Sequence, residues 1–232
     1  MEWKRYHIGD GCLCWQLGDT IDSALSRRVI FTYRRIKAKM AAGELDLLDV
    51  VPSYNAVAVH FDPALADIDA LCARIDALVN EAAEGAETFS GTDHRLSVIY
   101  NGPDLERVAR CSGLSVDEVI AIHSAGTYQV AMIGFKPHYP YLIGLDPRLE
   151  TPRLETPRTA VPAGSVAIGG AQTGVYPCES PGGWNIIGTT DPERLISIEP
   201  GDTVYFLRTD GGCPVKIEVE PGRTDAVGGG LA

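Results

Sequence analysis

The stretch between Gly134 and Trp184 carries most of the side chains in this 232-residue sequence that suit the binding of a ligand. It opens with GFKPHYPYL, continues through the glycine-rich run GGAQTGVYP and closes with SPGGW. Glycine lets a backbone approach a ligand closely, and proline fixes a loop before the ligand arrives. The corners of a β-barrel need the same residues, so the composition favours a preformed pocket and a set of barrel corners about equally.

Three arginines in this stretch are candidate anion ligands. Arg148, Arg153 and Arg158 could each hold a carboxylate or phosphate through two parallel hydrogen bonds. The default alternative is that they pair with acidic neighbours on a solvated face. The repeated Thr-Pro-Arg at 151–153 and 156–158 predicts an extended segment on a surface, because closely spaced prolines withhold ladder hydrogen bonds.

Other side chains could position or activate a substrate. Gln172 and Thr173 could hydrogen-bond a substrate amide, although both residue types also suit a turn. His123 could act as a general base, although a histidine near the end of a helix is also favoured by the helix dipole alone. Cys178 could be a nucleophile, but no partner histidine can be identified for it.

The familiar nucleotide and metal motifs are missing from the sequence. No lysine follows a glycine, which excludes a GxxxxGK[ST] phosphate loop, and no GxGxxG, HExxH or GxSxG occurs. The six cysteines show no CxxC spacing, so we expect reduced, mostly buried thiols and no metal site.

The overall charge of the chain narrows its partners. The net charge is −11 and the isoelectric point about 4.9, which argues against nucleic acid and anionic membranes as partners. The stretch from Gly134 to Trp184 is nearly neutral, so an anionic small molecule can still bind there. The amino-terminal residues do not resemble a signal peptide and no apolar run could span a bilayer, so we expect a cytoplasmic protein.

The first hundred residues alternate between strand and helix patterns. Apolar residues at three- and four-residue steps predict a helix from Ser23 to Ala42, and Asp62-Pro63 predicts the start of a second one. The order β-α-β-β-α-β predicts a ferredoxin-like α+β domain over residues 1–100. The predicted strands are Cys12–Leu17, Leu47–Val51, Ala56–Phe61 and Leu96–Tyr100.

The second half reads as a β-domain behind a helical connector. Residues 101–126 hold two predicted short helices, Asp104–Cys111 and one that opens with a capping box at Ser115. Residues 127–220 predict a β-barrel, because short apolar runs alternate with Gly/Pro turns, and residues 221–232 read as a flexible tail. The predicted barrel strands are Tyr128–Ile133, Ser165–Ile168, Trp184–Ile187, Thr203–Leu207 and Val215–Val219.

The motifs of the central stretch occur together in one known family. These motifs are Gly134-Phe135, Pro140-Tyr141-Leu142, Gly144-Leu145-Asp146-Pro147-Arg148-Leu149, the doubled Thr-Pro-Arg, Val161-Pro162-Ala163-Gly164-Ser165, Gln172-Thr173-Gly174-Val175-Tyr176-Pro177 and Ser180-Pro181-Gly182-Gly183-Trp184, with Pro52-Ser53-Tyr54 upstream. Through them the sequence resembles, over about residues 8 to 207, the B-type subunit of bacterial 5-oxoprolinase. The family also contains the kinase inhibitor KipI, and the same domain is called allophanate hydrolase subunit 1 and forms part of the carboxyltransferase region of urea carboxylase.

The resemblance implies a fold, an activity and partners. The fold would be a ferredoxin-like domain followed by a cyclophilin-like β-barrel. The chain would pair with a C-like subunit that is also cyclophilin-like and, with an A-like subunit, would open the amide or lactam ring of 5-oxo-L-proline to L-glutamate at the expense of ATP. ATP would be bound by the complex, and this chain would be inactive alone.

The resemblance also implies which residues face the shared site. His123, Arg148 and Gln172 would be catalytic, and the substrate would be bound by Tyr141, Arg153, Arg158, Thr173, Tyr176 and Ser180. The family usually has Gly-Phe where this chain has His138-Tyr139, and arginine where it has Thr189. Alternative roles within the family are inhibition of a histidine kinase and service as a carboxyltransferase component.

Overall fold

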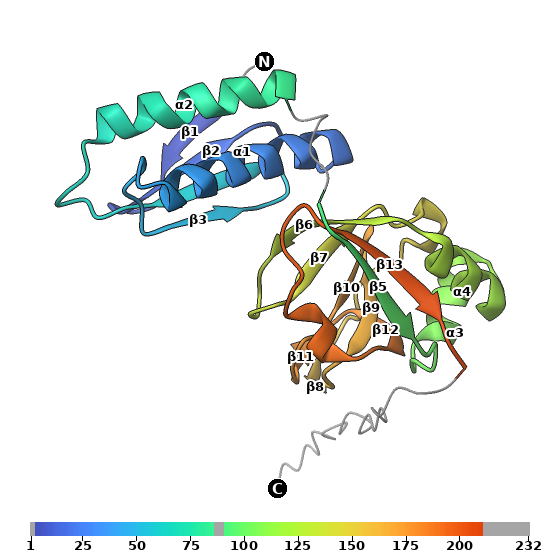
Figure 1. The fold of residues 1–232 in the computed structure, drawn as a ribbon. Helices are drawn as coiled ribbons and strands as arrows, with labels where there is room; N and C mark the ends of the chain where they lie inside the picture. Colours follow the sequence, from blue (N-terminus) through green and yellow to red (C-terminus); the bar gives the residue numbers. More distant parts are fainter. Residues whose placement is uncertain (1–2, 86–90, 211–232) are drawn as a thin grey trace, which may run out of the picture.

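The computed structural model describes residues 3–85 and 91–210, which form two domains, each around its own sheet (Figure 1). The first domain is a four-stranded antiparallel sheet in the order β1-β2-β4-β3, with two helices packed on it. Its core contains Trp15, Val29, Val57 and Ile75, none of which is exposed. The elements are β1 (Lys4–His7), β2 (Cys12–Gln16), α1 (Ser23–Ala41), β3 (Asp49–Pro52), β4 (Ala56–His60) and α2 (Ile68–Gly85).

The two helices begin differently from one another. Helix α1 is as predicted, and the side chain of Asp22 accepts a 2.8 Å hydrogen bond from the backbone N–H of Leu25 at its start. The prediction that α2 begins at Asp62-Pro63 was wrong. Asp62 instead holds a separate turn, and Asp67, five residues later, accepts the 3.0 Å hydrogen bond from Ala70 N–H at the start of the helix.

The strand that follows α2 was also placed in the wrong sheet. The pattern at Leu96–Tyr100 predicted a fourth strand for the first domain, but β5 (Asp93–Val98) pairs in parallel with β13 (Thr203–Arg208) of the second. The edge position beside β2 is taken by β1, which forms a hairpin with it. A strand pattern identifies a strand but not its partner, because pairing depends on contacts far along the chain.

The second domain is a seven-stranded sheet that curls into a nearly closed barrel, in the order β12-β9-β10-β7-β6-β13-β5. Its two edge strands approach each other where Ile99 and Thr189 exchange two 2.9 Å backbone hydrogen bonds. The α+β fold class is therefore confirmed. The remaining barrel strands are β6 (Tyr128–Ile133), β7 (Pro140–Ile143), β9 (Ser165–Gly169), β10 (Gln172–Val175) and β12 (Asn185–Thr189), and β8 (Arg158–Val161) and β11 (Ser180–Gly182) form a separate pair.

Two short helices cover one side of the barrel (Figure 1). Helices α3 (Leu105–Ser112) and α4 (Val116–Ala125) pack against β12 and β13 respectively. The predicted capping box is present, with Ser115 Oγ accepting from Glu118 N–H and the Glu118 carboxylate accepting from Ser115 N–H. Short 3-10 turns, η2 (Pro147–Leu149) and η3 (Pro192–Leu195), complete the connections.

The central stretch is more regular than its composition predicted. Strands β7 and β10 lie inside the sheet, and the glycine-rich run 169–174 is the β9–β10 hairpin rather than a loop. The predicted strand Val215–Val219 and the predicted tail lie outside the described residues. The predicted domain limits stay predictions.

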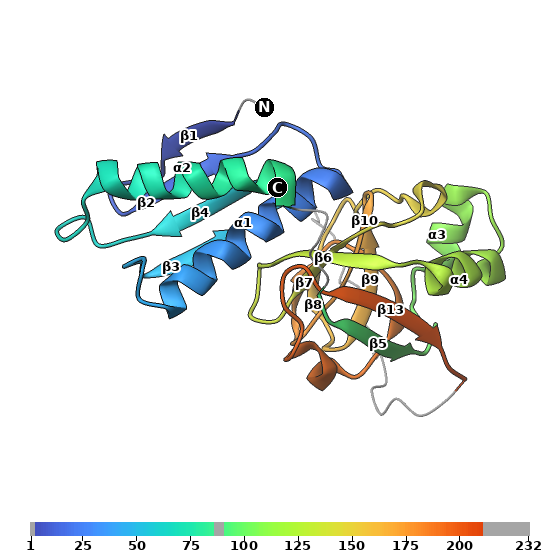
Figure 2. The same cartoon turned by 45° about the horizontal axis from the view of Figure 1, so that its top comes forward.

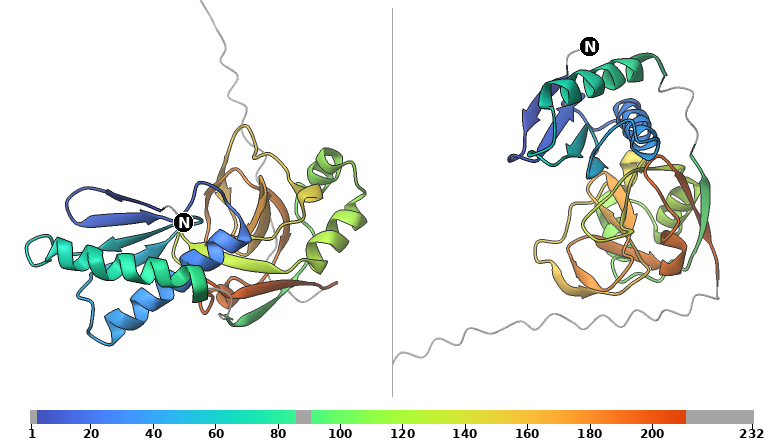
Figure 3. Two further views of the ribbon diagram at one scale, coloured as in Figure 1. Left: turned by 90° about the horizontal axis from the view of Figure 1, so that it is seen from above. Right: turned by 60° about the vertical axis from the view of Figure 1, so that its left-hand side comes forward.

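The two domains meet along α1 and the β3–β4 hairpin (Figures 2 and 3). Both elements contact β6 of the barrel. Among the helices of the described residues, none combines the length and apolar character needed to cross a membrane.

Candidate functional site

Three aromatic side chains that are separated in the central stretch of the sequence pack together in the fold. We call Tyr139, Tyr176 and Trp184 the aromatic floor. The rings of Tyr139 and Tyr176 meet edge to face at 5.1 Å between centroids, and Tyr139 meets Trp184 in the same way at 6.0 Å. All three are at most 5% exposed and form a small apolar cluster of their own. The Tyr139 that departs from the family pattern is therefore part of this floor.

Glycine in the β9–β10 hairpin makes room for the indole of Trp184. A Cβ added to Gly169 would lie 2.6 Å from two atoms of that ring, and one added to Gly174 would lie 3.2 Å from a third. The φ of neither residue is positive, so the requirement is space rather than backbone conformation. This physical reason accounts for two glycines that the sequence analysis took as signs of a loop.

Polar side chains stand around the floor where the first domain meets the barrel. Tyr54, from the β3–β4 turn, meets Tyr141 edge to face at 6.1 Å between centroids. The guanidinium carbon of Arg153 lies 5.6 Å from the centroid of the Trp184 ring, a cation–π arrangement. The side chain of Gln172 lies near the hydroxyl of Tyr54. We call Tyr54, Tyr141, Arg153, Gln172 and Trp184 the junction cluster.

Two polar groups of the junction cluster lack a partner among the described residues. Within residues 3–85 and 91–210, Arg153 has no ion pair, and the buried hydroxyl of Tyr54 has no hydrogen-bond partner. Burial raises the pKa of Tyr141 and Tyr54, and the positive charge of Arg153 opposes the rise at both. A cation without a partner, beside neutral donors and a flat apolar wall, suits a small ligand that carries a carboxylate and an amide.

His123 lies in the barrel core, away from this cluster. It is 0% exposed, it stacks on Phe206 at 4.7 Å between ring centroids, and burial lowers its pKa to about 3. Its ring nitrogens bond Tyr100 Oη at 2.8 Å and Thr173 Oγ1 at 3.0 Å. This position argues against the acid–base role predicted for His123 and gives Thr173 a structural partner.

The three candidate arginines have different surroundings. Arg158 forms a part-buried ion pair with Asp104 at 2.8 Å, and the other oxygen of that carboxylate accepts from Ile186 N–H at 2.7 Å. Arg148 is 63% exposed and pairs with Asp146 at 2.7 Å, which helps lower the pKa of that carboxyl to about 2. Only Arg153 of the three is free for a ligand within the described residues.

The remaining predicted residues divide between the floor and its supports. Tyr141 and Gln172 belong to the junction cluster and are half-buried, whereas Tyr176 lies in the floor itself. Ser180 is buried and its hydroxyl donates to Cys178 O at 3.3 Å. The structure thus brings together Tyr141, Arg153 and Gln172, and places the other six predicted residues in the core, the supports or a separate surface.

Tyr54 is the residue that the list of candidates missed. It lies in the Pro52-Ser53-Tyr54 segment that resembles the family, but it is 80 residues before the start of the central stretch at Gly134. Of the other departures, His138 is exposed with a φ of 65°, and Thr189 is buried with its hydroxyl 3.2 Å from Asn101 Oδ1.

Fold and site together define an α+β protein of two domains, whose ligand-binding candidates lie where a barrel meets a smaller sheet domain. Comparison with known proteins makes this specific, since residues 3–196 match the family "Carboxyltransferase domain, subdomain C and D". The chain belongs to this family, which includes the B-type subunit of 5-oxoprolinase.

Three relatives are named as the B-type subunit of 5-oxoprolinase. The protein of Haemophilus influenzae is 41% identical over 180 residues, covering 73% of this chain and 83% of the relative. That of Escherichia coli O157:H7 is 36% identical, covering 90% and 98%, and that of Bacillus subtilis is 33% identical, covering 88% and 93%.

Solved structures show the same fold inside longer chains. TTHA0988 superposes with a TM-score of 0.75 at 34% identity, covering 88% of this chain but 41% of its own. The urea amidolyase of Kluyveromyces lactis superposes with a TM-score of 0.68 over 89% of this chain and 15% of its own, and at 18% identity it supports the fold alone.

Proposed function

We propose that this chain is the B-type subunit of an ATP-dependent 5-oxoprolinase-type complex, which converts 5-oxo-L-proline to L-glutamate. The observation that carries the proposal is Arg153, which has no ion pair among the described residues and lies over the ring of Trp184, close to Tyr141. The names of the three relatives support the same activity.

The junction cluster suits the chemistry of this substrate. Arg153 would bind the carboxylate through charge-assisted hydrogen bonds, Gln172 would hydrogen-bond the lactam, and the ring would lie against the aromatic side chains. A lactam carbonyl is a weak electrophile, and phosphorylation of its oxygen at the expense of ATP makes its carbon easier to attack. The part assigned to this chain is binding and orientation of the substrate.

The site would be completed by other subunits. The glycine-rich run 169–174 is a β-hairpin and not a loop before a helix, so it does not fit the phosphates of ATP. We therefore assign nucleotide binding to a partner, with C-like and A-like subunits as the expected partners. TTHA0988 carries this fold in under half of its length, which supports the view that the fold acts together with further domains.

The cysteines of this chain that the structure describes are free thiols, which suits the cytoplasm.

Reconstitution tests the proposal directly. The chain is co-expressed with C-like and A-like subunits from the same source, and glutamate formation from 5-oxoproline is measured with and without ATP. We expect ATP-dependent turnover by the complex and none by this chain alone. A complex that assembles fully but leaves 5-oxoproline unchanged would refute the proposed substrate.

A further inference from the structure

We propose that the first domain completes the ligand site, with the hydroxyl of Tyr54 hydrogen-bonding the ligand and the contact between Arg34 and Asp202 holding Tyr54 in place. The identity of the ligand rests on the proposed function. In this arrangement Tyr54 is a binding residue, whereas Arg34 and Asp202 are positioning residues.

Tyr54 reaches the barrel from a tight turn of the first domain. Ser53 N–H donates to Ala56 O at 2.8 Å across that turn, which fixes the backbone on which Tyr54 stands. The ring meets Tyr141 edge to face, and the side chain of Gln172 lies beside the hydroxyl without the geometry of a hydrogen bond. The hydroxyl therefore points into the junction cluster.

The surroundings of this hydroxyl indicate a ligand partner. Its oxygen is buried and, in the described part of the chain, it is one of few buried side-chain nitrogen or oxygen atoms without a hydrogen bond. Buried hydroxyls are normally paired, because losing water without gaining a partner is unfavourable. Burial raises the pKa of Tyr54, so the hydroxyl keeps its proton at neutral pH and can donate to a carbonyl or carboxylate oxygen.

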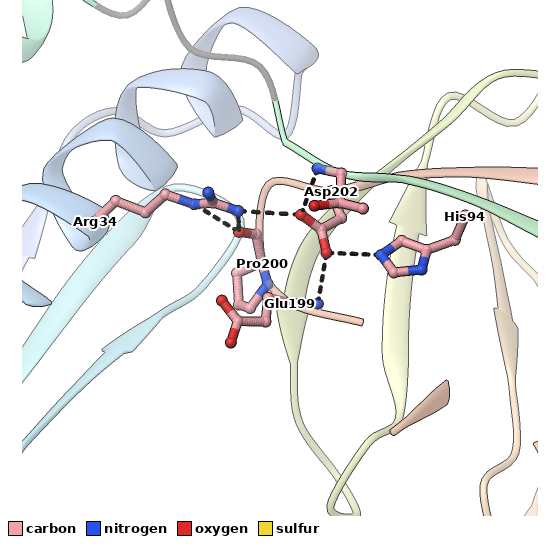
Figure 4. A network of polar contacts seen from close by, with 6 residues as sticks. Arg34, His94, Glu199, Pro200 and Asp202 are labelled. Atoms are coloured by element: carbon pink, nitrogen blue, oxygen red, sulfur yellow. Dashed lines mark hydrogen bonds and ion pairs between the residues drawn. The ribbon is translucent and has the colours of Figure 1, made fainter. Parts of the chain in front are cut away.

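The docking of the two domains is supported at a second point, shown in Figure 4. Arg34 of α1 donates to Pro200 O at 2.9 and 3.2 Å, and its Nη2 lies 3.2 Å from Asp202 Oδ1. The carboxylate of Asp202 is almost fully buried, and the guanidinium is 30% exposed. Arg34 and Asp202 are 168 residues apart in the chain.

Asp202 is itself rigidly held, so it can serve as a fixed anchor. Its Oδ1 accepts from Thr92 N–H at 3.0 Å, and its Oδ2 accepts from Glu199 N–H at 2.9 Å and bonds His94 Nε2 at 2.9 Å. These contacts lower the pKa of Asp202 against the effect of burial, which keeps it ionised at neutral pH.

The Arg34 contact and Tyr54 are mechanically linked through the first domain. Helix α1 packs on β3 and β4, the strands that the Tyr54 turn connects. Val29 and Ile36 on the helix share a core with Val50 and Val57 on the strands, and all four are buried. Interiors packed in this way transmit a displacement rather than absorb it. Loss of the Arg34 contact should therefore shift Tyr54 relative to Gln172 and Tyr141.

A Tyr54→Phe variant tests the binding role, because it should have opposite effects on stability and affinity. Removing an unpaired hydroxyl should leave the thermal stability of the chain equal or higher. Affinity of the assembled complex for 5-oxoproline, measured by calorimetry, should fall about 10- to 100-fold. Tyr128→Phe is the matched control, since Tyr128 Oη donates to His123 O at 2.8 Å and its loss should lower stability.

The positioning role is tested with the variant Arg34→Ala, and Arg35→Ala is its control. Arg35 pairs with Glu81 inside the first domain and makes no part of the contact between the domains described above. The first should weaken binding and speed hydrogen exchange at residues 53–56, and the second should do neither. With Tyr54→Phe added, the Arg34 variant should bind no more weakly than the weaker single variant.

Three results would overturn the inference. These are unchanged affinity of Tyr54→Phe, a loss of stability in it as large as in Tyr128→Phe, or equal exchange in the two arginine variants. If the wild-type complex does not bind 5-oxoproline, the proposed substrate fails, and the titration is repeated with glutamine, glutamate and allophanate. The inference then stands if Tyr54→Phe weakens whichever of these binds, and it falls if none binds.

Discussion

The Nε2 of His123 lies 3.0 Å from Oγ1 of Thr173, and both side chains are completely buried in the barrel. The Thr173 hydroxyl donates its own proton to Ala167 O at 3.0 Å, so it accepts the proton of Nε2. Nδ1 then accepts from the hydroxyl of Tyr100, whose pKa is raised by burial. His123 is thus a neutral imidazole with its proton on Nε2.

The buried imidazole should make stability depend on pH below about 6.5. Unfolded His123 takes up a proton there, whereas the folded residue, with its pKa lowered to about 3, does not. The unfolded state therefore binds more protons, and stability falls by up to about 1.4 kcal/mol per pH unit as pH drops through this window.

Urea unfolding of wild type and His123→Gln between pH 7 and pH 4 checks this. The glutamine can keep both hydrogen bonds but does not titrate, so its curve should be flatter by that slope. The pKa of Asp202 is lowered, so protonation of its carboxylate in acid also destabilises the fold, but it does so equally in both proteins. Parallel curves would contradict a neutral buried histidine.

Arg153 and Arg148 should differ sharply in their effect on substrate binding. Arg153→Gln should raise the KM of the complex for a carboxylated substrate about 10- to 100-fold, because a charge-assisted hydrogen bond is lost. Arg148→Ala should change it less than about twofold, since that guanidinium is largely exposed and pairs with Asp146. Steady-state kinetics of the two variants measure both KM values. A larger rise in KM for Arg148→Ala than for Arg153→Gln would mean that Arg148 binds the carboxylate.

Arg158→Met should destabilise the protein by about 3–5 kcal/mol, because it leaves the buried carboxylate of Asp104 without its cation. Arg153→Met is the matched control, since it removes an exposed guanidinium from the same repeat and should change stability by less than about 0.5 kcal/mol. Chemical denaturation measures both. Similar values for the two variants would mean that the Asp104 pair contributes little.

Gly169→Ala should displace the indole of Trp184, because the new methyl would lie 2.6 Å from the ring. We expect a loss of about 1–3 kcal/mol in stability and a shift in tryptophan fluorescence. Gly134→Ala is the control, since its methyl would meet the Tyr141 ring at an ordinary 3.6 Å. Unchanged fluorescence in Gly169→Ala would show that the hairpin can move aside.

Local signals predicted much of the fold. The helix from Ser23, the capping box at Ser115 and the strand at Tyr128 are all present, because each depends on periodicity or on side chains a few residues away. Strands β7 and β10 were missed, because glycine and proline are typical of loops. The sequence does not show that glycine in the β9–β10 hairpin makes room for the Trp184 ring.

The site divides in the same way. Composition drew attention to Tyr141, Arg153 and Gln172, but an arginine in a ligand site and one in an ion pair look alike in sequence. Arg158 is in an ion pair because Asp104, 54 residues away in the chain, lies beside it in the fold. The residues next to Arg158 in the sequence do not indicate this partner.

By itself, the sequence determined the α+β character, the absence of the common phosphate loops and the stretch in which most of the ligand-binding candidates lie. These follow from short-range periodicity and from residue types. The tertiary structure alone decided that β5 joins the barrel, that His123 is buried and neutral, and that Tyr54 stands beside Gln172. Strand pairing, the burial of His123 and the approach of Tyr54 to Gln172 all depend on residues that are distant in the chain. Their contacts exist only once both domains have folded.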